Sequence, residues 1–188
     1  MLSIQEISSS IYGAWRLARV DREGMNWFNH SIAGFWHSFF VAVLVAPLLA
    51  PVLVFRFIGS TDEFDVGHTI ASELISYGLG WIVFPIVALL VCRLMNLTEH
   101  YVIYIIAYNW SHIIPAALIL PIVLSAILGL VPSDLVDFAL LAVTFAVFGY
   151  RWFIARVALS ADGLTAAALV VLEVIIDLLL YGGVKKFL

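Results

Sequence analysis

YVIYIIAYNWSHIIPAALILPIVLSAILGL, residues 101–130, is the stretch that decides the fold. It is long and apolar enough to cross a bilayer, yet it carries Asn109, Trp110, Ser111 and His112 near its middle. Polar side chains within a membrane span face protein or a hydrated cavity, because hydrocarbon offers them no hydrogen-bond partner. The stretch therefore predicts a helix in the interior of a membrane bundle rather than one that faces lipid.

The composition of the whole chain extends this prediction to a polytopic membrane protein. Of the 188 residues, 64% are hydrophobic and 12% are charged, and the mean hydropathy is +1.10. A soluble domain carries about twice that charged fraction. The formal net charge of −4 is spread over short loops, and no basic tract indicates nucleic-acid binding. We therefore expect one all-α domain with small extramembrane parts.

Apolar runs predict a bundle of five membrane spans joined by short polar turns. The runs cover residues 32–55, 69–92, 101–130, 135–157 and 164–181. Pro47 and Pro51 lie one helical turn apart in the first run, so its second half should kink. We expect an N-terminal segment at 1–30, the five-span bundle at 31–182 and a short tail at 183–188.

The N-terminal segment is predicted to contain an amphipathic interfacial helix at residues 3–20. Its apolar stripe recurs at three- and four-residue spacing through Ile4, Ile7, Ile11, Trp15 and Ala18. Ser3 and Glu6 have the spacing of a capping box. Four side chains suit the headgroup region as interfacial anchors, namely Trp15, Arg16, Arg19 and Trp27. Two placements stay open: flat on the membrane surface, or packed on the ends of the bundle helices.

The distribution of basic residues predicts the orientation in the membrane. With five spans, one side and its span ends receive Arg16, Arg19, Arg22, Arg93, Arg151 and Arg156. The other side receives Arg56, Lys185 and Lys186, unless the last run only dips in and returns. The positive-inside rule then places the N-terminus in the cytoplasm. The use of arginine in preference to lysine resembles that of bacterial inner-membrane proteins, so we expect a multi-pass protein of the bacterial inner (plasma) membrane.

Glu173 and Asp177 are the strongest candidates for a functional site. They lie four residues apart and so share one face of the last span. At 1.5 Å per residue, Glu173 lies about 15 Å from a span entry near Gly163, close to the bilayer midplane. His112 lies about 16 Å from the start of its own span on the same side. A contact between His112 and Glu173 is therefore possible, with Asn109 one helical turn below.

Arg151 lies about 9 Å from the end of its span, and its long side chain reaches either the membrane interface or Glu173. With it, the predicted intramembrane polar centre consists of Asn109, His112, Arg151, Glu173 and Asp177. Two interpretations stay open. The centre is either a proton relay or small-solute site, or a set of polar contacts that holds the helices together.

No signature of catalysis or of cofactor binding accompanies this centre. The five histidines show no paired metal-ligand spacing, and the single Cys92 excludes an internal disulfide. The sequence contains no HExxH, CxxC, glycine-rich phosphate loop or nucleophile elbow. We therefore expect a protein that is not an enzyme and needs neither metal nor cofactor.

The layout and one short pattern resemble those of a known family. The pattern AYNWSHIIPA at residues 107–116, with Ala107, Tyr108 and Pro115, resembles the third span of the Yip-type family of small five-span membrane proteins. That family includes bacterial members of unassigned role. The resemblance covers roughly residues 30–182, and it implies a helical bundle with a cytoplasmic N-terminal segment and no enzyme signature.

The leading functional hypothesis is an accessory or scaffold protein that acts through contacts with lipids and with other membrane subunits or further copies of itself. Very small loops and faces rich in aromatic and small residues, among them Gly78 and Gly80, motivate it. The alternative is a small transporter or channel, oligomeric because five spans are few for an alternating-access carrier. Glu173, Asp177 and His112 would line its pathway. A cavity that reaches Glu173 would favour this alternative.

Overall fold

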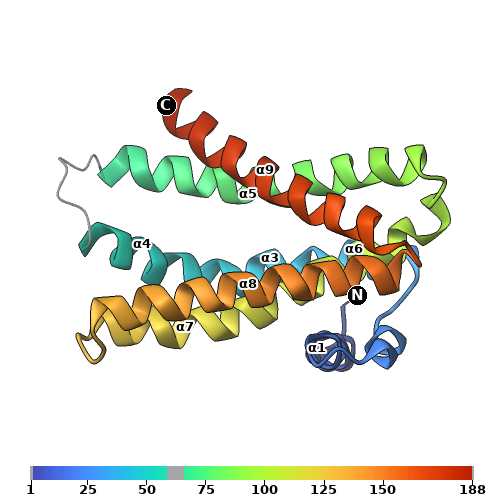
Figure 1. Ribbon diagram of the computed structural model, residues 1–188, viewed down its shortest axis with the longest axis horizontal. Helices are drawn as coiled ribbons and strands as arrows, with labels where there is room; N and C mark the ends of the chain where they lie inside the picture. Colours follow the sequence, from blue (N-terminus) through green and yellow to red (C-terminus); the bar gives the residue numbers. More distant parts are fainter. Residues whose placement is uncertain (1, 59–65, 188) are drawn as a thin grey trace.

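The structure, a computed structural model, describes residues 2–58 and 66–187 (Figure 1). Within these ranges every regular element is helical, which confirms the predicted all-α class. Five stretches are long and apolar enough to cross a membrane, namely Ile32–Phe55, Gly67–Leu94, Thr98–Ile127, Ser133–Ala158 and Gly163–Leu180. They match the predicted runs to within a few residues. The chain is therefore a multi-pass membrane protein with a helical bundle.

The helices of the bundle form two layers (Figure 1). One layer contains α5 (Val66–Leu94) and α9 (Gly163–Phe187), which cross and pack against one another. The other contains α4 (Leu49–Ile58), α7 (Ile113–Ile127) and α8 (Ser133–Ala158). Because α8 packs against both α7 and α9, it joins the two layers. Figure 1 shows the layers diverging from that junction toward the opposite end of the bundle.

The first span is broken into short helices, at Pro47 as predicted and also at Phe39, where the sequence has no proline. It consists of α2 (Ile32–Ser38), α3 (Phe40–Val45) and α4. The 3-10 turn η2 (Ala46–Leu48) separates α3 from α4 and contains Pro47. Proline removes a backbone donor and its ring clashes with the carbonyl four residues earlier, so a regular helix does not continue through it.

The stretch that decides the fold is also broken, at a point that the sequence analysis did not anticipate. α6 (Tyr101–Ser111) ends before His112, and α7 begins directly after it. Pro115 has no N–H to donate to the Ser111 carbonyl, and it disfavours helical geometry in the residue before it. The His112 N–H bonds to the Asn109 carbonyl at 3.2 Å, which tightens the last turn. One predicted span is therefore two helices end to end.

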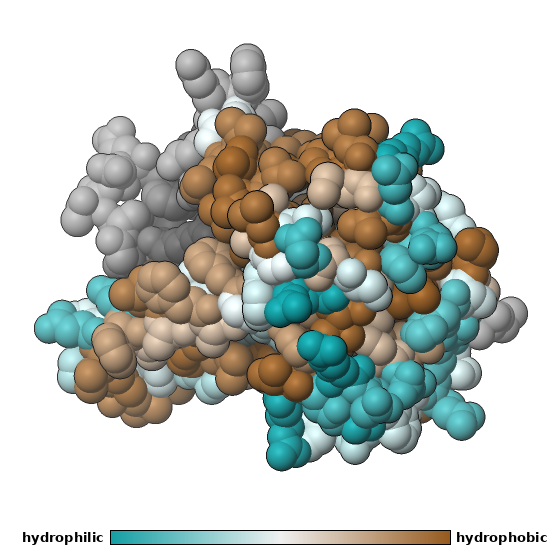
Figure 2. Space-filling view, turned by 45° about the vertical axis from the view of Figure 1, so that its right-hand side comes forward, coloured by the Kyte–Doolittle hydropathy of each residue, from teal (hydrophilic) through white to brown (hydrophobic). Residues whose placement is uncertain are grey.

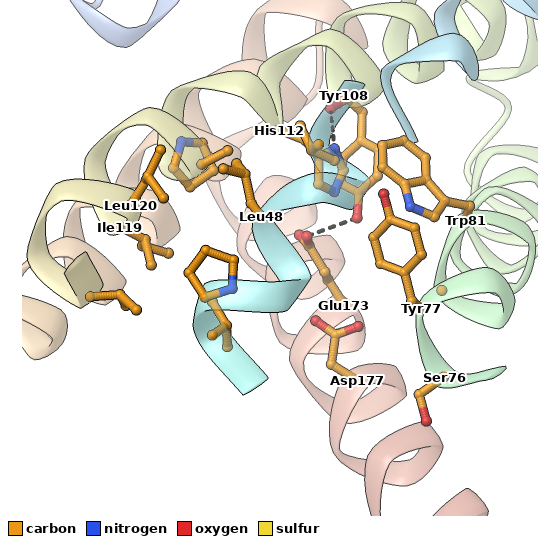
Figure 3. Close-up of a pocket in the computed structure, with 17 residues that line it drawn as sticks. Leu48, Ser76, Tyr77, Trp81, Tyr108, His112, Ile119, Leu120, Glu173 and Asp177 are labelled. Carbon is orange, nitrogen blue, oxygen red and sulfur yellow. Dashed lines mark hydrogen bonds between the residues drawn. The ribbon is translucent and has the colours of Figure 1, made fainter. Parts of the chain in front are cut away.

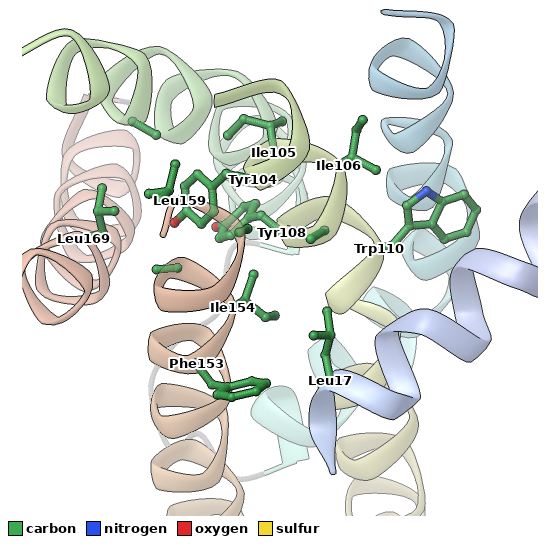
Figure 4. Close-up of a cluster of buried hydrophobic side chains, with 14 of the residues drawn as sticks. Leu17, Tyr104, Ile105, Ile106, Tyr108, Trp110, Phe153, Ile154, Leu159 and Leu169 are labelled. Atoms are coloured by element: carbon green, nitrogen blue, oxygen red, sulfur yellow. The ribbon is translucent and has the colours of Figure 1, made fainter. Parts of the chain in front are cut away.

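α6 lies at the centre of the bundle, as predicted. All eight residues from Tyr104 to Ser111 are buried, and the helix is covered on every side. Figure 4 shows Ile105, Ile106 and Trp110 pointing outward from it among residues of other helices, including Leu17 of the N-terminal helix. A helix that is apolar all round belongs inside a core, which explains why this short segment carries so few exposed atoms.

The N-terminal helix α1 (Ile4–Ala18) docks on the flank of the bundle. Figure 1 shows it end-on while the spans run across the picture, so its axis lies across theirs. Its docked face consists of Ser10, Gly13, Ala14 and Leu17, and it contacts α6, α7 and α8. The Tyr150 hydroxyl donates a hydrogen bond to the Ala14 carbonyl at 2.8 Å. Tyr150 lies about 12 Å before the end of α8, so α1 packs beside the spans and not on their ends.

Most of the predicted apolar stripe of α1 faces away from the bundle, whereas Ile7 packs against the core. Ile4, Ile11 and Trp15 are 86%, 36% and 43% exposed. The helix therefore has a docked face and an outward apolar face. Ser3 caps the helix by accepting from the Glu6 N–H at 3.1 Å, but the reciprocal half of the capping box does not form.

Glu6 ties α1 to the start of the first span. Its carboxylate accepts a hydrogen bond from the Asn29 side-chain amide at 3.0 Å and lies 3.0 Å from Nδ1 of His37. Of the predicted anchors, Trp15 and Trp27 are exposed, and the Arg19 guanidinium lies 4.7 Å from the centre of the Trp15 ring. Arg16, the fourth anchor, instead donates from Nε to the Asp21 carboxylate at 2.6 Å.

The C-terminal segment corrects one predicted boundary. α9 continues without a break to Phe187, so residues 183–187 extend the last helix instead of forming a separate tail. An unbroken helix also excludes the alternative in which the last run dips in and returns. The two termini accordingly lie toward opposite ends of the bundle (Figure 1).

The surface has a polar end and apolar flanks. Figure 2 turns the end that carries the α5–α6 and α8–α9 turns toward the viewer, and hydrophilic side chains gather on part of that face. Large apolar side chains are exposed along the flanks, among them Ile82, Ile86, Leu178 and Leu179. This division is what a bundle surrounded by hydrocarbon requires, because apolar side chains on a lipid-facing flank are already in their preferred solvent.

Asp162 caps α9 in the turn that follows α8. Its Oδ1 accepts from the Leu164 N–H at 2.8 Å and from the Thr165 N–H at 2.9 Å, and its Oδ2 accepts from the Thr165 hydroxyl at 2.9 Å. The backbone and side-chain hydrogen bonds from Thr165 hold the pKa of Asp162 below its usual value of 3.8, although partial desolvation opposes them. Three accepted bonds make this carboxylate a strong start signal for α9.

Replacing Asp162 by alanine is expected to lower the thermal unfolding midpoint at neutral pH. Because the pKa of Asp162 is lowered on folding, its contribution is fully present above the unfolded pKa and is lost as the pH falls through the folded pKa. The gap between Asp162→Ala and the unchanged protein should therefore narrow below about pH 4. Asp162→Asn, which keeps an acceptor, should stay close to the unchanged protein at neutral pH. A gap that does not vary with pH would contradict this assignment.

Candidate functional site

Glu173 of α9 meets side chains of two other helices inside the bundle, and Figure 3 shows the first of them, Tyr108. Its Oε1 accepts a hydrogen bond from the Tyr108 hydroxyl of α6 at 2.8 Å and lies 3.5 Å from Nε of Arg151 on α8. The Arg151 side chain is 5% exposed and that of Glu173 is 14% exposed. Of the two alternatives for Arg151, the structure shows the inward one, an ion pair with Glu173.

The break after α6 explains why Arg151 binds at this point. Its Nη1 donates to the Tyr108 carbonyl at 2.9 Å and to the Ser111 hydroxyl at 2.5 Å, both in the last turn of α6. The C-terminal end of a helix carries a partial negative charge and unpaired carbonyls, which favour a cation. The guanidinium also lies 4.2 Å from the centre of the Tyr108 ring. Arg151 therefore compensates the negative charge of the Glu173 carboxylate and the partial negative charge at the end of α6.

Asp177 lies one turn after Glu173 on the same face of α9, as predicted. In residues 2–58 and 66–187 it has no ion pair and no side-chain hydrogen bond, unlike Glu173. A cleft of about 330 Å³ reaches both carboxylates. It lies between the α3–α4 and α7 side of the bundle and the α5 and α9 side, where the two layers diverge (Figures 1 and 3).

The walls of the cleft are aromatic and acidic at one end and apolar elsewhere. Tyr77 and Trp81 of α5 and Tyr108 of α6 supply aromatic rings around the carboxylates (Figure 3). The apolar remainder is formed mainly by Val45, Leu48, Pro51, Val52, Ile119 and Leu120. Glu173 and Asp177 are acidic, and no lysine or arginine lines the described part of the cleft. The cavity is therefore amphipathic and carries negative charge.

His112 lines the same cleft but does not make the predicted contact with Glu173. Its Nδ1 lies 3.1 Å from the Tyr108 carbonyl and 3.2 Å from the Asn109 carbonyl, so this nitrogen carries the hydrogen and donates. The two rings Tyr108 and His112 are 4.9 Å apart, and Trp81 packs against His112 at 4.5 Å. Tyr108 thus connects the two residues, through its hydroxyl to Glu173 and its ring to His112.

Asn109 lies outside this centre, which corrects the prediction. Its side-chain amide donates to the Ser38 hydroxyl of α2 at 2.9 Å, and Ser38 donates in turn to the Phe35 carbonyl at 2.7 Å. Successive residues of an α-helix point about 100° apart, so Tyr108 and Asn109 reach different neighbours. Asn109 joins α6 to α2 instead of forming part of the cleft.

Tyr108 was not part of the predicted polar centre, and neither were the other two aromatic residues around the carboxylates, Tyr77 and Trp81. Tyr108 lies four residues before His112, which puts the two on one face of the third span. That spacing was the available signal, but a tyrosine between aromatic neighbours in a membrane span is also typical of packing. Its role depends on the third dimension, because Arg151 and Glu173 come from α8 and α9.

The polar groups of the site form hydrogen bonds and one ion pair. In the part of the chain that the structure describes, no three His, Cys, Asp or Glu side chains lie close enough to hold a metal ion. Comparison of the chain with protein-family models, with curated proteins and with solved structures found no match. The geometry of the cleft therefore carries the functional argument.

Proposed function

We propose that this protein is a small membrane transporter or channel whose cleft binds a small organic cation beside Glu173 and Asp177. The observation that supports this proposal is a cavity of about 330 Å³ that reaches both carboxylates. The accessory role favoured by the sequence alone requires no such cavity, whereas a solute pathway does. The volume lies at the lower end of the range for small-molecule sites, so the ligand is small.

Charge balance favours a cation. Arg151 offsets Glu173 through the ion pair at 3.5 Å, which leaves the negative charge of Asp177 without a partner in the described residues. A carboxylate inside a membrane span costs about 2.5–3.5 kcal/mol on insertion scales, and a bound cation would reduce that cost. The rings of Tyr77 and Trp81 add favourable sites for an alkylammonium group, whereas the Tyr108 ring is already covered by Arg151 and Phe84.

Binding of tetraethylammonium to the purified protein in lipid nanodiscs tests the ligand class. Asp177→Asn is expected to weaken binding by about tenfold, which corresponds to the loss of about 1.4 kcal/mol. Asp177 is the better residue for this test because Glu173 also pairs with Arg151, so its replacement changes stability as well. Asp134→Asn, an exposed acid in the first turn of α8, is the matched control and should leave binding unchanged.

Uptake of tetraethylammonium into proteoliposomes tests passage across the membrane. We expect uptake by the unchanged protein and a loss of uptake in Asp177→Asn at equal amounts of folded protein. Binding without uptake would contradict the transport proposal while retaining the cation site. Equal binding by Asp177→Asn, Asp134→Asn and the unchanged protein would contradict both.

We further propose that the protein lies in the bacterial inner membrane with its N-terminus in the cytoplasm. Arg22, Arg93 and Arg156 are exposed at the N-terminal end of the bundle, which supports this orientation under the positive-inside rule. The outward stripe of α1 would then rest on the cytoplasmic leaflet. The resemblance to the Yip-type family agrees with this topology and stays a prediction.

An accessory role is the second candidate, and one observation favours it. A Cβ atom added at Gly78 of α5 would meet nothing within 4 Å, so the face of this helix that carries Gly78 is an open surface with a small residue. Such a surface lets a helix of another subunit, or of a second copy, approach closely. Purification in mild detergent checks this candidate. A defined complex that Gly78→Leu dissociates would support it, and a monodisperse single chain would contradict it.

A further inference from the structure

A second hollow, which shares no lining residue with the cleft, lies where the N-terminal segment meets the end of α8. It has a volume of about 340 Å³ and is lined by Arg22, Arg156, Val157, Ser160 and Ala161. Arg22 is the first residue of the 3-10 helix η1 (Arg22–Trp27), which packs against α8. Docking of the N-terminal segment therefore brings two arginines together that lie far apart in the chain.

The two arginines of this hollow have no acidic partner in the described chain. Neither Arg22 nor Arg156 forms an ion pair there, although the Arg156 guanidinium lies 5.1 Å from the centre of the Trp152 ring. The acids next to the hollow in sequence form hydrogen bonds with other groups. Asp21 accepts from Arg16 at 2.6 Å, Glu23 accepts from Asn26 at 2.6 Å, and Asp162 accepts from Thr165 and Leu164. Neither guanidinium group of the hollow is therefore paired with a carboxylate in the described chain, an arrangement that a bound anion would relieve.

The backbone of the hollow also has free donors. Among residues 2–58 and 66–187, four adopt a positive φ angle: Val20, Asn96, Gly129 and Ser160. After the first three, the next N–H donates to a carbonyl five residues earlier, at 2.8–3.1 Å, and closes the helix end. Within the described chain the N–H groups of Ser160 and Ala161 make no such bond. Leu159 and Ser160 have the right- and left-handed conformations of an anion-binding nest.

We propose that this hollow binds a phosphate group, held by the guanidinium groups of Arg22 and Arg156 and by the backbone N–H groups that follow Leu159. Arginine forks match the tetrahedral oxygens of phosphate, and each charged hydrogen bond is stronger than a neutral one. The partial negative charge at the end of α8, about half a charge, and the nearby Asp162 carboxylate oppose an anion, whereas the two guanidinium groups attract it directly.

A phospholipid headgroup is the source that the position favours. The hollow lies at the polar end of the bundle and beside the N-terminal segment whose exposed Trp15 and Trp27 suit the headgroup region. Free phosphate shares the same chemistry. The two sources differ in whether acyl chains contribute, and this difference can be measured directly.

The test uses the full-length protein, delipidated in detergent, and follows its thermal unfolding midpoint as ligand is added. Dioleoyl phosphatidylglycerol is expected to raise the midpoint in a saturable manner, and dioleoylglycerol, which lacks the phosphate, should not. The double variant R22Q/R156Q is expected to require about tenfold more phosphatidylglycerol for the same rise. R93Q removes an exposed arginine at the same end of the bundle but outside the hollow, and it should behave as the unchanged protein.

Inorganic phosphate distinguishes the sources. No rise with phosphate, together with the rise with phosphatidylglycerol, identifies a lipid headgroup site. If both phosphate and phosphatidylglycerol raise the unfolding midpoint, and R22Q/R156Q weakens both effects, the hollow is a site for free phosphate groups. The proposal is overturned if dioleoylglycerol is as effective as phosphatidylglycerol, or if R93Q weakens the response as much as R22Q/R156Q. Because both arginines are exposed, the double variant should fold, and its midpoint without ligand checks this.

Discussion

Arg151→Met should be the most destabilising single substitution in this protein, with a loss of about 3–5 kcal/mol in the free energy of unfolding. The arginine is 5% exposed and serves three partners: Glu173, the Tyr108 carbonyl and the Ser111 hydroxyl. Without it, the Glu173 carboxylate stays in a low-dielectric interior with only the Tyr108 hydroxyl as a partner. Titration with a denaturing detergent, or thermal unfolding in mild detergent, measures the loss.

The double variant Arg151→Met with Glu173→Gln separates charge from packing. The amide oxygen of glutamine still accepts the hydrogen bond from Tyr108, and the uncompensated charge is gone. The double variant should therefore be more stable than Arg151→Met alone. Arg93→Met, at an exposed position on α5, is the control and should change stability by less than about 0.5 kcal/mol. If the double variant is as unstable as Arg151→Met, the ion pair with Glu173 is not the reason why Arg151 stabilises the protein.

Gly34→Ala should have the second largest effect on stability, about 1–3 kcal/mol or more. A Cβ at this position would lie 1.9 Å from the carbonyl oxygen of Asn29 and 2.8 Å from its carbonyl carbon. Both are backbone atoms that no side-chain rotation moves away. Asn29 also donates to Glu6, so its displacement would loosen α1 from the bundle. Limited proteolysis within residues 2–30, together with the unfolding midpoint, measures both consequences.

Gly149→Ala is the matched control for that substitution. Gly149 lies inside α8, and a Cβ there would meet nothing within 4 Å. Alanine is a better helix former than glycine by about 1 kcal/mol, so this change should be neutral or stabilising. If Gly34→Ala behaves like Gly149→Ala, the contact between α2 and the Asn29 backbone is not as close as the structure has it.

The membrane architecture was predictable from the sequence because hydrophobic length alone decides it. The five spans, the kink at Pro47 and the interior position of Tyr101–Ser111 all follow from local composition. The break at His112 was not predicted, although Pro115 is its cause, because prolines within membrane spans often only bend them. The sequence indicates where a helix is weak, but not whether its neighbours accept a break.

The composition of the polar centre was predictable only in part, because it depends on rotation about each helix axis. Glu173 and Asp177 share a face by their spacing, and Arg151 reaches Glu173 as its length allows. Asn109 was assigned to the centre on depth alone, but it points toward Ser38 instead. The depth of a residue along a span follows from counting residues. The direction in which its side chain points around the helix axis depends on which helices pack together, and the sequence does not say which do.

The crossing of α1 over Tyr150 has a consequence for the electrostatics of the whole assembly. If its outward stripe rests among the lipid headgroups, the headgroup region extends along the last two turns of α8, from Tyr150 to the hollow at Arg156. Arg151 and Glu173 then lie just beneath that region, and not at the midplane. The desolvation cost of these two charges is therefore smaller than at the midplane. Most of a transmembrane voltage would fall across the part of the membrane between the ion pair and the opposite leaflet. A cation at Asp177 would sense nearly the full potential when it leaves in that direction.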